Sequence, residues 1–154
     1  MVERDVFKVT REGSQLCLTG VVDEHAELTF LLTLSGPKAV LNLRGVRRIN
    51  SYGVRAWLDL IRKVPLDVSL EFVAIPPHIV DQVNMVTGFL GRGHVGSFCV
   101  PYSCERCGAD EERLVPTENC RRTGRLPAAQ CDTCGATMEI DDVEEQYIEI
   151  LREM

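Results

Sequence analysis

The sequence is poor in aromatic residues and has no long apolar segment. Aromatic residues make up 6% of its 154 residues, and charged residues make up 26%. Its longest apolar stretches have the length of a β-strand, well below the roughly 20 residues that a membrane-spanning helix needs. The first residues also lack the apolar segment of a signal peptide. We therefore expect a soluble, cytoplasmic protein that has no membrane partner.

Basic residues are scarce in the C-terminal third of the chain. Residues 1–98 have a charge balance of +1, whereas residues 99–154 have a balance of −7. Nucleic-acid binding draws much of its affinity from basic residues that displace counterions from phosphates. The acidic C-terminal segment therefore argues against a nucleic-acid partner.

Four of the seven cysteines form two short, repeated units. They read Cys104-Glu-Arg-Cys107-Gly108 and Cys131-Asp-Thr-Cys134-Gly135. A two-residue spacer lets both sulfurs of a unit face one ion, and the glycine permits the tight turn that follows. Four thiolates in a tetrahedral set are favoured ligands of Zn²⁺ and leave no open position for catalysis. The pattern predicts a zinc ribbon with one structural zinc ion bound by Cys104, Cys107, Cys131 and Cys134.

Disulfides and redox-active dithiols are the alternatives for these cysteines. An odd count and a reducing cytosol disfavour disulfides, and neither unit has the setting of a thioredoxin-like motif. The other three cysteines are predicted separately. Cys17 and Cys99 should be small buried residues in strands. Cys120 should be an exposed loop residue, although the neighbouring arginines provide a means of lowering its pKa.

Residues 1–98 alternate between strand-like and helix-like patterns. The predicted strands are residues 7–10, 15–22, 39–43, 68–75 and 97–101, and the predicted helices are residues 28–34, 52–64 and a segment after Pro76-Pro77. Helices between strands imply crossover connections and a largely parallel sheet with one antiparallel hairpin. The predicted fold class is therefore α/β, with a mixed sheet and crossover helices.

The composition changes after Pro101. Cysteines, charged residues and turn residues dominate up to residue 140, and large core residues are not evident. Asp141 and Glu144 then have capping-box spacing at the start of an amphipathic helix. The apolar face of this helix comprises Val143, Tyr147, Ile150, Leu151 and Met154. The predicted division is an α/β domain at 1–98, a zinc ribbon at 99–140 and a C-terminal helix at 141–154.

The segment from Ala39 to Leu58 carries a family resemblance. A strand-like stretch, Leu41-Asn-Leu-Arg-Gly-Val46, precedes Asn50-Ser51-Tyr52-Gly53, after which a helix follows. This order resembles the STAS domain, in which the loop reads roughly Asp-Ser-Ser-Gly, and the stretch Leu18–Asp23 also resembles a family segment. The resemblance covers about residues 5–100. It implies a STAS-like fold and a role similar to that of the anti-sigma factor antagonists of bacterial partner-switching signalling.

The same resemblance implies a role for Ser51 as a phosphorylation site that switches partner binding. The partner would be a protein similar to the small kinase-like anti-sigma factors. A phosphate at a helix start would meet free N–H groups and the positive end of the helix dipole. Asn50 replaces the family's aspartate and Tyr52 replaces a small serine. A second interpretation therefore stays open, in which Ser51 only caps the helix.

Several arginines lie close to this motif in the sequence. Arg44, Arg47, Arg48 and Arg55 would form a basic patch, which is either a solvated face or a docking site for an acidic partner. The predicted partner surface comprises Asn50, Ser51, Tyr52, Gly53, Arg47, Arg48 and Arg55. The alternative function is a constitutive scaffold or assembly protein, and a homodimer is compatible with both.

No segment predicts catalysis. Residues 91–96 match Gly-x-Gly-x-x-Gly, but they follow a predicted helix and lead into a predicted strand. A dinucleotide site requires the reverse order. The sequence therefore predicts a binding protein without catalytic residues.

Overall fold

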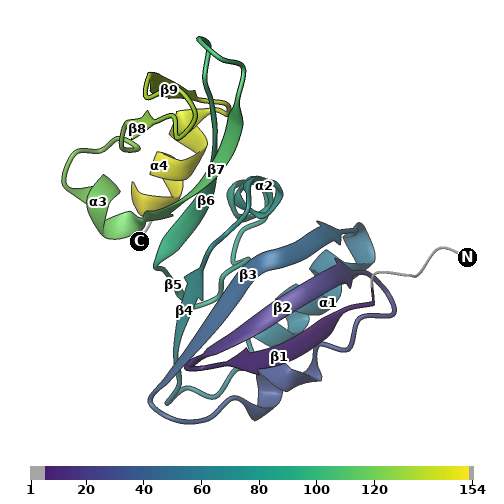
Figure 1. Cartoon of the computed structure of the whole chain (residues 1–154). Coiled ribbons are helices and arrows are strands. Elements are labelled where there is room, and N and C mark those ends of the chain that lie inside the picture. Colours follow the sequence, from purple (N-terminus) through teal and green to yellow (C-terminus); the bar gives the residue numbers. More distant parts are fainter. Residues whose placement is uncertain (1–5, 153–154) are drawn as a thin grey trace, which may run out of the picture.

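The first of two β-sheets is formed by the N-terminal part of the chain in the computed structural model, which describes residues 6–152. Its strands are β1 (Lys8–Glu12), β2 (Gln15–Val22), β3 (Lys38–Ile49), β4 (Ser69–Val73) and β5 (His94–Val95), in this spatial order. β1 and β2 form an antiparallel hairpin, whereas β2 to β5 pair in parallel. The predicted mixed α/β sheet with one hairpin is confirmed (Figure 1).

Three short helical segments accompany this sheet: η1 (Thr29–Thr33), α1 (Ser51–Ile61) and α2 (Pro77–Met85). Trp57 of α1 packs against Phe72 of β4, with ring centroids 6.2 Å apart. Its indole Nε1 also donates a 2.6 Å hydrogen bond to the carbonyl of Phe89. The helix predicted at residues 28–34 is a short 3₁₀ segment, which ends before Ser35-Gly36-Pro37.

The second sheet consists of β6 (Ser97–Ser103), β7 (Asp110–Pro116), β8 (Ala129–Gln130) and β9 (Thr137–Ile140), in the spatial order β7-β6-β9-β8. All of its pairings are antiparallel. The strand predicted at 97–101 was assigned to the N-terminal sheet, and that assignment is wrong. The extended residues were recognised correctly, but hydrogen-bond partners from a distant part of the chain decide the sheet to which they belong.

The two sheets, each with its neighbouring helices, form two lobes. An almost continuous extended segment joins the lobes. Only Gly96 separates β5 from β6, and its N–H donates to the carbonyl of Phe72. One residue further, the Ser97 hydroxyl accepts a 2.8 Å hydrogen bond from the N–H of Ala74, and Ile75 forms a parallel bridge with Phe98. β6 therefore crosses the predicted boundary between residues 98 and 99 and bonds to both lobes.

The second lobe also has large core residues, contrary to the expectation from its composition. They include Tyr102, Val115, Leu126, Met138 and Tyr147, all of them buried. The rings of Phe98 and Tyr147 meet edge to face with centroids 5.3 Å apart. These residues belong to one apolar cluster that continues into the first lobe. Tyr147 was expected to be buried, but the other four were missed because they are spread singly among charged residues and meet only after folding.

The C-terminal helix α4 (Glu144–Arg152) packs against α2 and the second sheet. The Asn84 side chain on α2 donates a 2.9 Å hydrogen bond to the carbonyl of Gln146. α3 (Thr117–Arg121) lies beside the same helix (Figure 1). The predicted burial of Tyr147 and Ile150 is confirmed, and Leu151 is half-buried.

Three details of the tail prediction do not hold or cannot be placed. Val143 is 56% exposed and lies before α4, so it is not on the buried face. The capping box is absent, because the Asp141 N–H donates to the Pro101 carbonyl and the Glu144 carboxylate accepts from the N–H of Leu126. Met154 lies outside the described residues.

Candidate metal centre and partner surface

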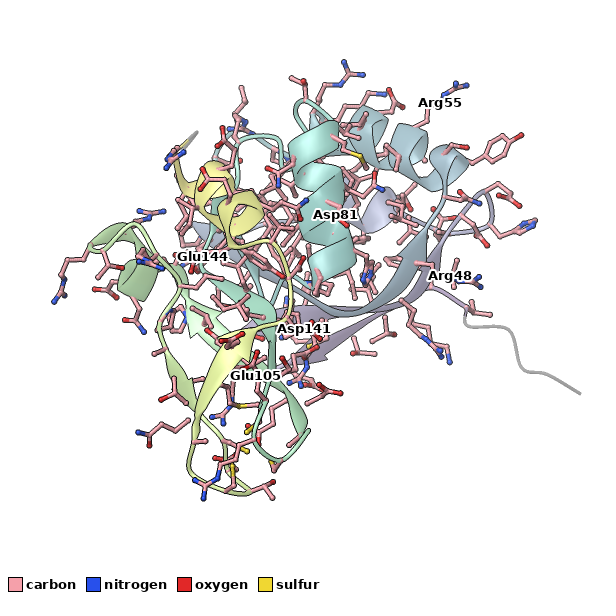
Figure 2. The ribbon with its side chains drawn as sticks, turned by 90° about the horizontal axis from the view of Figure 1, so that it is seen from above. Arg48, Arg55, Asp81, Glu105, Asp141 and Glu144 are labelled. Carbon is pink, nitrogen blue, oxygen red and sulfur yellow. The ribbon has the colours of Figure 1, made fainter. Side chains whose placement is uncertain are left out.

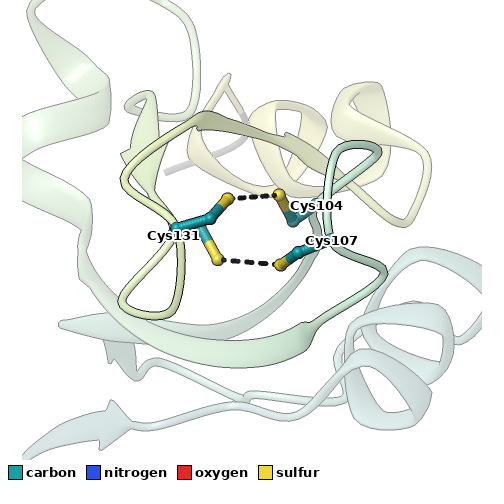
Figure 3. Close-up of side chains that lie close together, drawn as sticks. Cys104, Cys107 and Cys131 are labelled. Carbon is teal, nitrogen blue, oxygen red and sulfur yellow. Dashed lines mark hydrogen bonds between the residues drawn. The ribbon is translucent and has the colours of Figure 1, made fainter.

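Four cysteine sulfurs converge at the tip of the second lobe. The Sγ atoms of Cys104 and Cys134 are 3.5 Å apart, and those of Cys107 and Cys131 are 3.6 Å apart (Figure 3). All four lie within 4.8 Å of one another, and none forms a disulfide. A tetrahedral ion bound at about 2.3 Å from each sulfur needs sulfur–sulfur separations of about 3.8 Å. The four cysteines therefore form a set that can hold one metal ion.

The two units adopt the same backbone geometry. In the first, the Gly108 N–H donates to the Cys104 carbonyl at 2.8 Å, and in the second, the Gly135 N–H donates to the Cys131 carbonyl at 2.9 Å. Both glycines have a positive φ, 76° and 77°, which residues with a side chain rarely adopt. The glycine that follows each unit is thus required by the turn that aims the two sulfurs at a common point.

The thiols of the cluster are unequal as acids. The Cys107 N–H lowers the pKa of Cys104, and the Cys134 N–H lowers the pKa of Cys131 to about 7. The N–H of Ala109 acts to lower the Cys107 pKa, but the three neighbouring sulfurs and burial together outweigh it and raise this pKa to about 12. The pKa of Cys134 is likewise raised. A metal ion that binds all four thiolates must therefore displace protons from the second cysteine of each unit.

An ion-pair network joins the loops that carry the two units. Arg113 on β7 pairs with Glu111 and lies 3.4 Å from the Asp132 carboxylate in the second unit. It also donates a 2.7 Å hydrogen bond to the carbonyl of Gln130, while the Asp132 N–H donates to Glu111. Sequence reasoning did not identify this network. The sequence pattern that could have indicated it is the alternation of a strand, which places Glu111 and Arg113 on the same face.

Of the three remaining cysteines, one lies as predicted and two do not. Cys99 is buried as predicted, and burial raises its pKa to about 11. Cys17 is only half-buried, with its Sγ 3.6 Å from the Glu12 carboxylate, because its side of the sheet is the less covered one. Cys120 is not an exposed loop residue. It lies buried on α3, and burial raises its pKa instead of arginines lowering it.

The start of α1 is capped by Asn50, not by Ser51. The Asn50 side-chain oxygen accepts a 2.9 Å hydrogen bond from the N–H of Gly53, and its amide group donates to Glu24 at 3.1 Å. A Cβ at position 53 would lie 2.1 Å from the carbonyl oxygen of Val22. The glycine of the Asn-Ser-Tyr-Gly segment is therefore needed because the helix start presses against the end of β2.

Ser51 and Tyr52 lie on the surface in the first turn of α1. Both are exposed, and the Tyr52 side chain reaches 65% exposure. Glu24 lies nearby through its contact with Asn50, and its own backbone N–H and the Asn50 amide lower the Glu24 pKa. Sequence reasoning missed Glu24, because the loop after β2 reaches the motif only through the parallel pairing of β2 and β3.

Three of the four arginines lie near this helix start. Arg47 and Arg48 are exposed at the end of β3, and Arg55 is exposed one turn into α1. Figure 2 shows Arg48 and Arg55 on one side of the molecule, away from Glu105, Asp141 and Glu144. Arg44 does not belong to this patch, because it pairs with Glu112 of the second lobe at 3.2 Å.

No protein-family model, curated protein or solved structure matches this chain. Within residues 6–152, no helix has the length and apolarity that crossing a membrane requires. The chain thus presents a four-sulfur cluster suited to a metal ion and, on the other lobe, an exposed helix start flanked by cations.

Proposed function

We propose that this protein is a regulatory protein–protein interaction module. Its first lobe would be a STAS-like domain that binds a protein partner, similar to a kinase-like anti-sigma factor. Its second lobe would be a zinc ribbon in which the ion is structural. The order of strands and helices, the Asn-Ser-Tyr-Gly helix start and the four-sulfur cluster support this proposal.

The observation that carries the proposal is the rigid display of Ser51 and Tyr52. Both side chains are exposed, but the backbone beneath them is held by the Asn50 cap and by the contact of Gly53 with Val22. Surface aromatic residues on a fixed backbone are favourable anchors for a partner, because little conformational freedom is lost on binding. This surface would therefore be the centre of the interface.

Phosphorylation of Ser51 would change this surface strongly. Ser51 and Arg55 are four residues apart on α1, so a phosphate on Ser51 would face the Arg55 guanidinium. It would also lie at the positive end of the helix dipole and add nearly two negative charges beside Glu24. A partner that docks on the unmodified surface would then meet an altered charge with little change in fold.

The cluster chemistry favours zinc among the metals that proteins use. Four thiolates are soft ligands, and their tetrahedral arrangement suits Zn²⁺. With all four positions occupied by protein sulfurs, the ion would hold the two units together and would not bind a substrate. Elemental analysis of the purified protein should find about one zinc per chain.

The test is an affinity measurement with a partner isolated by pull-down. Ser51→Asp should weaken binding about tenfold or more, and Ser51→Ala should not, while both keep the wild-type melting temperature. Ser14→Asp in the turn between β1 and β2 is the matched control, because it adds the same charge to another exposed serine. Equal affinities for wild type, Ser51→Asp and Tyr52→Ala would refute the proposed surface.

The exposure of Tyr52 also supports the second candidate, a constitutive scaffold. In that case Tyr52→Ala would weaken binding, whereas neither change at Ser51 would. A partner that proved to be a second copy of the chain would identify the homodimer, which sedimentation over a range of concentrations would detect.

A further inference from the structure

A pocket of about 370 Å³ opens at the end of the first sheet opposite to Ser51. It lies between the β1–β2 hairpin, the end of η1 and the beginning of β3, which come together in the lower part of Figure 1. Its size is within the range of pockets that hold small molecules. None of its lining residues belongs to the proposed partner surface or to the metal centre.

The pocket has an apolar floor that is not fully covered. Leu34 and Ala39 are buried there, whereas Leu16 and Phe30 are only half-buried and line the opening. The ring of Phe30 is tilted against the ring of Phe7, with centroids 6.2 Å apart, and this contact helps to fix the position of Phe30. A ligand with an apolar body would remove the remaining exposed carbon surface from water.

Arg11 lies beside this floor. On β1 it lies opposite Leu16, and two residues earlier Val9 lies opposite the buried Leu18. Directly opposed residues in an antiparallel pair share one face of the sheet, so Arg11 lies on the face that carries the core. Arg11 is itself exposed, so its guanidinium is hydrated and can take an anionic partner at the opening of the pocket.

The protein does not supply that partner. The described residues that line the pocket include no carboxylate, and within residues 6–152 the Arg11 side chain makes no hydrogen bond or ion pair. Glu12, its neighbour, is on the opposite face, where its carboxylate contacts Cys17. Lys38, the second cation of the pocket, is paired with Glu71 at 2.7 Å. Arg11 is therefore the cation available to a ligand.

We propose that this pocket binds a small carboxylate with an apolar body, such as a medium-chain fatty acid. The carboxylate would pair with Arg11, and the hydroxyls of Ser14 and Ser35 at the rim would offer further hydrogen bonds. The carbon chain would lie over Leu16 and Phe30. This site is independent of the proposed partner surface and of zinc.

The experiment uses the full chain and octanoate as the probe, with titration followed by ¹H–¹⁵N NMR and calorimetry. Octanoate should bind saturably, and the shifted amides should concentrate in residues 9–16 and 30–40. Octanamide has the same apolar body without the charge, and it should bind about tenfold more weakly. Acetate has the charge without the body and should show no saturation.

Two variants on the same strand sharpen the test. Arg11→Glu should weaken octanoate binding about tenfold or more, whereas Lys8→Glu should change it less than about twofold, because Lys8 is exposed on the other face of β1. Octanamide that binds as tightly as octanoate would overturn the proposal. So would an unchanged affinity in Arg11→Glu, or saturable shifts located elsewhere. The comparison of octanoate with octanamide needs no variant, so it stands even if Arg11→Glu does not fold.

Discussion

Different interactions stabilise the two lobes of this protein. The first buries strand and helix residues around Trp57 and Phe72, and its core is apolar throughout. The second has a smaller core around Tyr102 and Tyr147, and its far end is organised by the four sulfurs. Small structures that bury little apolar surface commonly depend on a metal for stability. The comparison indicates that the far end of the second lobe should respond to metal removal and the first lobe should not.

The largest effect is expected from the loss of a metal ligand. Cys104→Ser should abolish metal binding and expose the amides of β8, β9 and both cysteine units, because three sulfurs no longer close the tetrahedron. Hydrogen exchange followed by mass spectrometry would locate the change, with Cys17→Ser as the control for loss of a thiol. If exchange also rose throughout β2 and β3, the stability of the first lobe would depend on the metal as well.

A second prediction concerns the core that the lobes share. Tyr147 is fully buried, meets Phe98 edge to face and donates a 2.6 Å hydrogen bond to Asp142. Tyr147→Ala should lower the free energy of unfolding by about 3–5 kcal/mol, and Tyr147→Phe by about 1 kcal/mol.

Urea titrations of the two Tyr147 variants, followed separately by Trp57 fluorescence and by a probe in α4, would measure both losses. Because α4 packs on α2, we expect both probes to shift together. A shift confined to the α4 probe would show that the first lobe keeps its stability alone.

The pH dependence is the third prediction, of smaller size. Burial raises the Cys99 pKa to about 11 from an ordinary value near 9, so the folded state keeps a proton that the unfolded state loses. The resulting stability is complete below about pH 9 and is lost as the pH rises towards 11, by up to about 2 kcal/mol. Unfolding at pH 8 and pH 10.5 would show a smaller loss in Cys99→Ala than in wild type. An identical loss would assign the effect to other buried groups, such as Tyr102 and Cys120.

The smallest effect is expected at the junction of the lobes. Ala74 has φ of 53°, which costs a residue with a side chain about 1 kcal/mol, and it precedes the bridge to β6. Ala74→Gly should relieve this strain and offset the loss of the methyl group, leaving stability within about 0.5 kcal/mol of wild type. Ala56→Gly within α1 is the matched control and should cost about 1 kcal/mol. Equal losses in the two variants would exclude strain at Ala74.

Much of the first lobe could be predicted because its signals are local. The turn at Gly13 and Ser14 separates two apolar alternations, and they form the hairpin β1–β2. The cysteine cluster could also be predicted, since each unit fixes two sulfurs within four residues and its glycine supplies the turn. The predictions that were wrong concern features that depend on contacts between residues distant in sequence. Cys120 was misplaced because α3 is covered by α4, more than twenty residues further along.

By itself, the sequence determined where most strands and helices of the first lobe lie and which four cysteines converge, because strand alternation, turn glycines and ligand spacing act over a few residues. Only the tertiary structure decided that β6 leaves the first sheet for the second, that α4 fills the space between α2 and β6, and that Asn50 reaches Glu24. These outcomes depend on hydrogen bonds and apolar contacts between segments tens of residues apart. No local pattern specifies such contacts, because each segment could satisfy its own periodicity against several different neighbours.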